Sequence, residues 1–491
     1  MIHINGKTVN LGYFNLFEDA VHCREAAEEK YYGEYRPDTE RSTKRLPIPS
    51  GASSILNVLH SNGFDAYVVG GCIRDSLLRI EPKDWDICTS ATPEQILECF
   101  SDRRIIKTGL KHGTVTVVMD DDQYEVTTFR MDGKYSDNRH PDSVEFVKDV
   151  RWDLARRDFT INAIAYNSNG FVDPFGGIYD LWNQELTCVG NPDDRFAEDA
   201  LRILRALRFA SVYGFQINEN TAQSIHRNKD RLKTIAAERI QSELCKLLCG
   251  RGVLDVLLDY SDVIAVIIPG MEPCIGFDQN NKYHEYTVYD HIAHAVANSN
   301  TSDVVVRMAL LLHDIGKPQC YSCDKNGGHF YYHSLQSCNI ALRVLGKLRF
   351  DNKSAHEITD LVFYHDAVIE PTPKCVRKWL NRLGEKQFMR LLEIRMADIL
   401  AHKKETQDEN MQKCRRVGEI AKQIIMEDQC FKLKDLAIDG YDVMDVCGAE
   451  GAEIGRILNE VLDTVIEGTL ENTKENIIKY LEEHYDKRRK I

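Results

Sequence analysis

The sequence lacks long apolar stretches. None of them approaches the roughly 20 residues that a membrane-spanning helix requires, and the first residues lack the apolar centre of a secretory signal. The 15 cysteines are scattered along the chain and form no disulfide pattern. Together these absences favour a cytoplasmic protein with reduced thiols and without a membrane partner.

The chain also lacks an excess of positive charge, since its formal net charge is −14. This sign is wrong for a protein that binds nucleic acid without specificity, so any RNA partner must contact local basic patches. There is no low-complexity tract and no repeat of fixed period. One Cys-x-x-Cys pair, Cys320 and Cys323, has no second pair nearby, and a chance occurrence is favoured over a zinc site. The length of 491 residues predicts three or four domains.

Two glycines and two aspartates carry the strongest signal. Gly70 and Gly71 precede a helix-like run that contains Arg74, and glycine lets backbone N–H groups approach a phosphate at a helix N-terminus. Asp84 and Asp86 follow in an apolar strand pattern, whose period of two places both carboxylates on one face. Such a pair suits magnesium beside a triphosphate. The order and spacing of these motifs predict nucleotidyl transfer.

A third carboxylate, Glu125, lies in the alternating segment 123–130, which we expect to form a strand beside the first. Three carboxylates at one place can hold two divalent cations for an in-line displacement. The predicted catalytic residues and magnesium ligands are Asp84, Asp86 and Glu125, and the predicted phosphate-binding residues are Gly70, Gly71 and Arg74.

Two further pairs are candidates for nucleotide binding. Arg157 and Asp158 suit a phosphate and a ribose hydroxyl, with a capped, solvated helix start as the structural alternative. Asp199 and Arg202 are three residues apart on a predicted helix, where an ordinary ion pair is the alternative. Cytosine and adenine both present an exocyclic amine beside a ring nitrogen that accepts a hydrogen bond. A carboxylate and a guanidinium would select these two bases together, without a template.

With these residues in place, the chain resembles the class II tRNA nucleotidyltransferases, the CCA-adding enzymes of the DNA polymerase β superfamily. The resemblance covers about residues 50–270 and rests on the ordered segments 70–75, 84–86, 111–115, 125–130, 156–163, 198–202 and 238–240. It implies template-independent addition of CCA to the 3′ end of tRNA from CTP and ATP, with magnesium as cofactor. It also implies that Asp199 and Arg202 read the base, and we expect Arg205 and Arg208 on the same helix to bind nucleotide.

The fold implied by the resemblance is α+β. A nucleotidyltransferase head with a small, mostly antiparallel mixed sheet precedes an all-helical neck, body and tail. The expected boundaries are an N-terminal extension at 1–45, the head at 46–190, a nucleotide-selecting and RNA-binding neck at 191–272, an HD-type helical domain at 273–402 and the tail at 403–491.

Two segments bear on the product. Residues 130–141 match the flexible loop of the family, which supports the switch from C to A and argues against an enzyme that adds only CC. Poly(A) polymerases share the head but usually carry a basic Gly-Arg-Arg-Phe-like strand, and residues 105–109 lack it. CCA addition is therefore favoured over a poly(A) polymerase.

A second set of candidate metal ligands lies in the helical half. His313 and Asp314 are adjacent at the end of an apolar helix, and their setting resembles the HD phosphohydrolase superfamily, in which His and Asp hold one or two divalent metals. Such a centre can direct water at phosphorus, whereas the alternative is a metal-stabilised body that only holds tRNA. The resemblance implies a core set of His291, His313, Asp314 and Asp398, with His333 and His365 for a second divalent transition metal. Asp366 competes with Asp398 for the last position.

The remaining segments are less informative. Residues 2–35 resemble the end of the small DNA-binding domain of plant ethylene-response factors and some phage HNH endonucleases, but the preceding strands are missing, so a truncated, non-binding remnant with a hairpin turn at 4–7 is expected. Trp379 and its basic neighbours suit either an RNA-facing patch or a solvated helix surface. An HD phosphohydrolase with an idle head and a noncatalytic RNA-binding protein stay open as alternatives, and the oligomeric state is not indicated.

Overall fold

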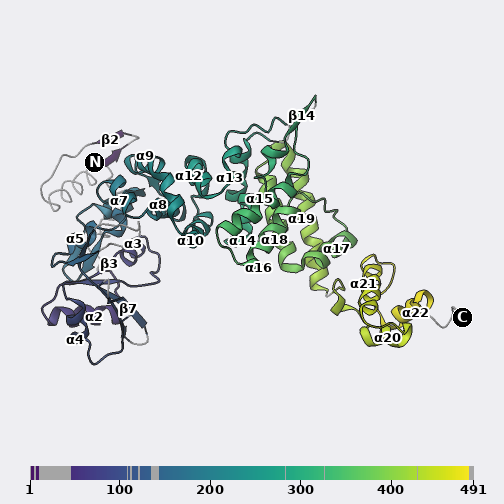
Figure 1. Ribbon diagram of the computed structural model, residues 1–491, viewed down its shortest axis with the longest axis horizontal. Coiled ribbons are helices and arrows are strands. Elements are labelled where there is room, and N and C mark those ends of the chain that lie inside the picture. The colour runs from purple at the N-terminus through teal and green to yellow at the C-terminus, as the bar shows by residue number, and fades with distance from the viewer. Residues whose placement is uncertain are drawn as a thin grey trace. The chain divides into compact units, whose positions relative to one another are not determined.

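The computed structural model describes residues 2–4, 7–9, 46–107, 109–110, 113–119, 122–133, 143–281, 284–325, 327–427 and 429–485. The chain divides into two compact units, which Figure 1 follows by colour from the N-terminus to the C-terminus. The first comprises Met1–Asp132, Val144–Arg157 and Ile161–Ile178, and the second comprises Gly133–Ser143, Asp158–Thr160 and Tyr179–Ile491.

The N-terminal extension is described only as an antiparallel pair, β1 (Ile2–Ile4) with β2 (Lys7–Val9), in which Ile4 pairs with Lys7. This pairing agrees with the expected hairpin. The rest of the predicted DNA-binding remnant lies outside the described residues, as do residues 134–141 of the predicted flexible loop.

The first unit is built on a seven-stranded sheet with the order β11-β10-β3-β4-β7-β6-β5. Only β4 and β7 are parallel, and the other neighbours are antiparallel, which confirms the expected mixed sheet. The strands are β3 (Ala66–Val69), β4 (Ile87–Thr89), β5 (Ile105–Ile106), β6 (Thr114–Met119), β7 (Asp122–Thr128), β10 (Ala165–Asn167) and β11 (Gly170–Val172). A separate pair joins β8 (Arg130–Asp132) to β9 (Val144–Phe146).

Helices cover this sheet because buried and partly exposed side chains alternate along its strands. In β6 the side chains of Val115, Val117 and Met119 are buried, while Thr116 and Val118 between them are partly exposed. Helix α2 contacts β3 and β4, and α4 contacts β6 and β7. The helices of this unit are α2 (Ser50–Ser61), α3 (Gly71–Leu77), α4 (Pro93–Cys99) and α5 (Val150–Ala155), and the turn η4 (Thr160–Asn162) follows.

The second unit is almost entirely helical in its described residues. Its first part contains α6 (Gly177–Asn183), α7 (Pro192–Glu198), α8 (Leu201–Tyr213), α9 (Glu219–Asn228), η5 (Lys229–Thr234), α10 (Ala237–Leu248), α11 (Val253–Asp259), α12 (Ser261–Ile267) and η6 (Glu272–Cys274). The short parallel strands β12 (Glu185–Leu186) and β13 (Gln216–Ile217) pair there. The strong leucine periodicity of α8 buries one side of this helix against α10 and α11.

The next part surrounds α14, whose sequence is apolar except for Arg307. Every side chain from Val305 to Leu312 is buried, because α14 contacts α10, α13, α15, α16 and α18. The elements of this part are α13 (Val288–Asn298), α14 (Val304–Leu312), η7 (Lys317–Cys320), β14 (Ser322–Asp324), β15 (Gly327–His329), α15 (His333–Lys347), α16 (Asn352–Tyr364), α17 (Pro373–Leu383), α18 (Glu385–Leu400) and α19 (Lys404–Met426). We call this part, α13 to α19, the body.

The last part has a hydrophobic core of its own, which extends from Cys430 to Leu481. It contains η8 (Leu433–Asp435), α20 (Gly440–Cys447), α21 (Ala452–Ile466) and α22 (Lys474–Tyr485). Because α19 packs against α17 and α18 of the body, a tail that starts at 403 stays a prediction.

Three sequence expectations meet the structure here. The RNA-facing interpretation of Trp379 is wrong, since this side chain is buried, packs edge-on against Tyr364 and is covered by the guanidinium of Arg382. The described cysteines are all free, as expected. In the described part of the chain no helix has both the length and the apolar character that a membrane crossing requires.

Candidate functional site

Asp84 and Asp86 lie just before β4 rather than inside it, so the prediction that both belong to a strand is wrong. The reason is that the neighbouring strand β3 ends at Val69. Val69 N donates a hydrogen bond to Asp86 O at 3.0 Å, so pairing continues to Asp86. One step further, Asp84 would face Gly71, which already belongs to α3.

Glu125 lies beside Asp86, as predicted. The parallel register pairs Ile87 with Val126, both buried, so the preceding residues Asp86 and Glu125 project together from the opposite face. Burial raises the pKa of Asp86 against the opposing charge of Arg157, and the carboxylates of Glu125 and Asp84 raise it further. The three acidic groups are therefore close enough to interact electrostatically at one edge of the sheet.

This oxygen-only donor set suits a hard divalent cation such as magnesium. The three carboxylates do not yet form a closed ligand shell, however. Among the described residues, the sets whose ligand atoms lie within 4.8 Å of one another all belong to the second unit.

The glycine pair begins α3, as predicted. Gly70 caps this helix with a φ of 82°, and a Cβ at this position would lie 2.6 Å from Arg157 Nη1. Arg157 is held there by Asp153, to which its Nη2 donates at 3.3 Å. Arg74 is buried, and its guanidinium donates to Asn162 Oδ1 at 2.7 Å and to Asp75 Oδ1 at 2.8 Å. Arg157 and Arg74 thus lie at the start of the helix, with their side chains fixed by neighbours in the same unit.

Asp158 and the arginines of α8 belong to the second unit and form ion pairs there. Arg205 donates to Asp158 Oδ2 from Nε at 2.8 Å, and the charge of Asp158 raises the pKa of Arg205. Arg208 pairs with Glu243 of α10. These contacts place the predicted nucleotide-binding arginines on one helix and show which carboxylates orient them.

Asp199 and Arg202 do not pair with each other, so the simple intrahelical ion pair is excluded. Asp199 lies between α7 and α8, where its Oδ1 accepts a hydrogen bond from Leu201 N at 3.0 Å and its Oδ2 contacts Arg239 Nη2 at 2.7 Å. Arg202 pairs instead with Glu198 and donates to Arg195 O. Arg239 and Glu198 are therefore the orienting partners. Glu198 lies four residues before Arg202, whereas Arg239 is forty positions from Asp199 and could not be found from local sequence.

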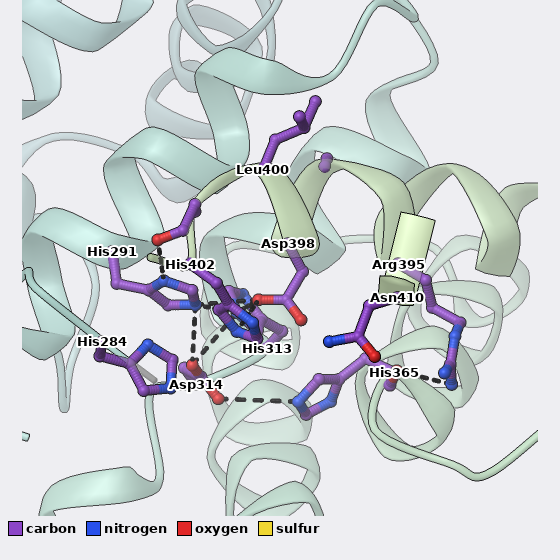
Figure 2. Close-up of polar contacts among 12 residues, drawn as sticks. His284, His291, His313, Asp314, His365, Arg395, Asp398, Leu400, His402 and Asn410 are labelled. Atoms are coloured by element: carbon purple, nitrogen blue, oxygen red, sulfur yellow. Dashed lines mark hydrogen bonds and ion pairs between the residues drawn. The ribbon is translucent and has the colours of Figure 1, made fainter. Parts of the chain in front are cut away.

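The body brings the predicted histidines and aspartates together (Figure 2). His291 Nε2 lies 2.9 Å from Asp398 Oδ1 and 3.3 Å from Asp314 Oδ2, and His313 Nε2 lies 3.2 Å from Asp314 Oδ2. Asp398 lies in this cluster, whereas Asp366 is exposed, so the geometry favours Asp398 as the candidate for the last ligand position. We call His291, His313 and Asp398 the inner set.

A second set shares Asp314. Its Oδ1 lies 3.4 Å from His333 Nε2 and 3.6 Å from His365 Nε2, while its Oδ2 faces the inner set. The two oxygens of Asp314 thus point toward two different groups of imidazoles. This is the arrangement of a carboxylate that bridges two ions.

The ring orientations favour metal ions. The Nδ1 atoms of four rings each lie near a backbone carbonyl oxygen, which only accepts hydrogen bonds, so Nδ1 carries a proton and Nε2 is the nitrogen that faces the cluster. These contacts join His291 to Ala401 O, His313 to Leu310 O, His333 to Phe330 O and His365 to Val362 O. The facing Nε2 atoms of His333 and His365 are only 3.2 Å apart, and two bare lone pairs at this distance repel unless a cation lies between them.

The buried charged groups of the body change one another's pKa values. Burial opposes the ionised form of Asp314, but the charges of His313 and Lys317 outweigh it and hold the pKa well below its ordinary value. Lys317 Nζ lies 2.6 Å from Asp314 Oδ2. Two histidines that the sequence did not suggest, His284 and His402, lie within 4.8 Å of His291. His402 was detectable in principle, since it follows Asp398 by four residues.

Comparisons with known proteins agree with this division. Family models match at residues 66–187 (Poly A polymerase head domain), 214–275 (Probable RNA and SrmB-binding site of polymerase A) and 331–481 (tRNA nucleotidyltransferase domain 2). The CCA-adding enzyme of Enterococcus faecalis is 50% identical over 200 residues, which are 40% of this chain and 49% of that protein. That of Oceanobacillus iheyensis is 47% identical over 203 residues, which are 41% and 50%. The chain thus spans about half the length of these curated relatives.

Solved structures extend the similarity along the chain. A crystal structure of the Bacillus stearothermophilus CCA-adding enzyme in complex with CTP has 29% sequence identity and a TM-score of 0.68, and the match covers 90% of this chain and 98% of that one. The Thermotoga maritima CCA-adding enzyme complexed with tRNA shares the fold at 18% identity and a TM-score of 0.56, over 90% of this chain and 97% of that one.

The sheet, the carboxylates at its edge and the matched head model define a nucleotidyltransferase of the poly(A) polymerase type, a fold that implies the use of divalent metal. Within this class, the chain is similar to the tRNA nucleotidyltransferases, which include the CCA-adding enzymes.

Proposed function

We propose that the chain adds CCA to the 3′ end of tRNA from CTP and ATP without a template, in the cytoplasm. The observation that carries this proposal is the parallel register of β4 and β7, which places Asp86 and Glu125 side by side, next to Asp84. The similarity to CCA-adding enzymes supports the substrates, since the printed names of two matched structures include CTP and tRNA.

Different residues of the first unit would bind the metal ions and the triphosphate. Asp84, Asp86 and Glu125 would hold divalent cations, magnesium by their oxygen-only chemistry, and these supply charge neutralisation and activate the attacking hydroxyl. The N-terminus of α3 at Gly70 and Gly71 offers backbone N–H groups to the triphosphate. Arg157 and Arg74 add positive charge at the same place.

Base selection falls to α8 and its neighbours. Asp199 accepts from an exocyclic amine, and Arg202 donates to the adjacent ring nitrogen, which favours cytosine and adenine over uracil and guanine. Arg239 and Glu198 orient these two side chains. Arg205 and Arg208 add positive charge on the same helix, while Asp158 holds Arg205.

The direct test measures incorporation of radiolabelled CTP and ATP into tRNA that lacks its CCA end. Asp84→Ala with Asp86→Ala should abolish incorporation, whereas Asp102→Ala, an exposed acidic residue paired with Arg103, should not. Full incorporation by the double variant would contradict the proposal. Sequencing the 3′ ends distinguishes CCA from a poly(A) tail, which is the alternative product.

We propose a second activity for the body, hydrolysis of a phosphate ester at a centre of two divalent transition metals. The bare Nε2 atoms that face each other and the bridging position of Asp314 support it. The inner set with Asp314 would hold one ion, and His333, His365 and Asp314 would hold the other. When bound, these ions lower the pKa of a water molecule and so supply a nucleophile for phosphorus.

Hydrolysis of bis(p-nitrophenyl) phosphate by the full chain, purified with manganese or cobalt, tests this second activity. Asp314→Asn removes the charge that both ions share and should lower turnover at least about 100-fold. His356→Gln is the matched control, because His356 is exposed on α16, where its side chain contacts Asp360. Unchanged turnover in Asp314→Asn would show that the body holds tRNA without acting on phosphate.

A further inference from the structure

A third group of imidazoles brings together His291 of the inner set and two histidines that the two proposed ions do not use. His284, His291 and His402 each offer a ring nitrogen, and these atoms lie within 4.8 Å of one another. The rings of His284 and His402 are 4.6 Å apart between centroids and meet edge to face, and both pack against His291 (Figure 2). We call these three residues the outer set.

His284 has a ring nitrogen that is available to a ligand. Its Nδ1 is buried and has no hydrogen-bond partner among the described residues. An orphaned nitrogen in a polar cluster costs stability unless a ligand satisfies it. His284 precedes α13, whereas His402 follows α18, so two segments far apart in sequence converge on His291 of α13.

His291 belongs to both the inner and the outer set, but it has only one nitrogen to offer. Its Nδ1 donates to Ala401 O at 3.2 Å, which leaves Nε2 for coordination. An ion that takes this Nε2 in the inner set therefore excludes an ion that takes it in the outer set. The inner and outer positions therefore cannot hold an ion at the same time.

Burial distinguishes the two positions. His291 and His313 are completely buried, whereas His284 and His402 are partly exposed. Asp398 is partly exposed as well, so the ligand that burial sets apart in the inner set is His313. An ion arriving from water meets His284 and His402 before it reaches the completely buried His313.

From these observations we propose that His284 and His402, with His291, form a histidine-only loading position through which a transition metal enters the inner set. The inference rests on the proposed metal centre of the body and extends it. All-nitrogen coordination selects borderline ions such as Zn²⁺, Co²⁺ or Ni²⁺ and disfavours Mg²⁺. Transfer then exchanges His284 and His402 for His313 and Asp398 around a fixed His291, with no bond to His291 broken.

The experiment follows Co²⁺ uptake by the metal-stripped full chain, using stopped-flow visible absorption, with the number of bound ions measured by elemental analysis. The variant His284→Gln with His402→Gln should load at least about tenfold more slowly than the wild type and end with the same number of ions. His356→Gln is the control and should load at the wild-type rate. Each single variant is measured as well, with circular dichroism to confirm folding.

Two results would overturn the loading position. One is an unchanged uptake rate in the double variant, and the other is the loss of one whole ion per chain, since that would mean a separate third site. A further variant separates this inference from the proposed hydrolysis. His313→Gln disables the inner set, and should still bind Co²⁺ at the outer set. If His313→Gln loses all metal binding at the inner set but hydrolyses phosphate esters as fast as the wild type, the proposed hydrolytic centre is refuted. The loading position would still stand.

Discussion

At the scale of single residues, Gly70 is the position on which the proposed triphosphate site of the head depends most. Its φ of 82° is accessible to glycine without strain, and its missing side chain leaves room for the guanidinium of Arg157. Backbone and side chain at the start of α3 are therefore positioned by the same residue.

Gly70→Ala should impair both folding and nucleotide binding. The added Cβ would lie 2.6 Å from Arg157 Nη1, and the left-handed backbone would be strained by about 1–3 kcal/mol. We expect a lower melting temperature and a raised KM for CTP. Gly63→Ala is the control, since Gly63 has a similar φ but open space around it. If the two variants raise KM equally, close approach to Arg157 is irrelevant.

Arg239 is expected to be a positioning residue for base choice. Removing its contact with Asp199 in Arg239→Ala should free that carboxylate and reduce the preference for CTP and ATP over UTP and GTP roughly 10-fold, as hydrogen bonds to charged groups contribute about 1.5–3 kcal/mol. Competition assays with the four nucleotides measure this ratio. Arg239→Lys should recover part of it, and Arg227→Ala, which breaks an exposed ion pair, should leave it unchanged. Lower incorporation without any change in selectivity would indicate a purely structural role.

The residues of the candidate sites could be named from the sequence, but the side chains that they contact could not. Spacing indicated Asp84, Asp86 and Glu125, and the adjacency of His313 and Asp314 indicated the inner set. Nothing local pairs Asp199 with Arg239, forty positions away, or places His284 against His402. These contacts depend on how α8 packs against α10, and on how the ends of α13 and α18 meet.

At the scale of elements, α5 holds the arginines beside the head carboxylates. Asp153 is completely buried within it and contacts Arg156 at 2.8 Å and Arg157 at 3.3 Å. Burial opposes its ionised form, but the two guanidinium charges outweigh this effect and lower the pKa of Asp153 below its ordinary value of 3.8.

The stability contributed by Asp153 should therefore depend on pH. The folded pKa is lower than the unfolded one, so the contribution is complete above about pH 4 and is lost as the pH falls through the folded pKa. Asp153→Asn should cost about 3 kcal/mol at neutral pH, because it removes the buried carboxylate that contacts both guanidinium groups, and Arg156 keeps its more distant contact with Asp132. Urea unfolding at pH 7 and pH 3 measures both effects. A difference between variant and wild type that is equally large at both pH values would contradict the ionic origin.

Elements were predictable where periodicity is strong. The alternating residues of 123–130 and the leucines of α8 indicated a strand beside β4 and an amphipathic helix, and the structure contains both. The start of β4 was misplaced, because a strand ends where its neighbour ends, and β3 gives way to α3 at Gly70. Such limits are set by pairing and are not visible within one segment.

At the scale of the whole molecule, the two units hold metal-ligand sets of opposite chemistry. The first offers three carboxylates, and the second offers six histidines with only two aspartates. The sequence indicated this division through family resemblance, since composition alone shows neither set.

This difference predicts distinct metal requirements for the two proposed activities of one chain. After removal of metal with EDTA and dialysis, Mg²⁺ alone should restore CTP and ATP incorporation, because oxygen ligands suit a hard cation. Phosphate-ester hydrolysis should need Mn²⁺, Co²⁺ or Ni²⁺, because imidazole nitrogen binds these ions far more strongly than Mg²⁺. The control adds Mg²⁺ and Co²⁺ together to the same stripped sample, where both activities should return. Equal recovery of both activities with Mg²⁺ alone would mean that the histidines of the body do not select the ion, and the assignment of His291, His313, His333 and His365 as metal ligands would fail with it.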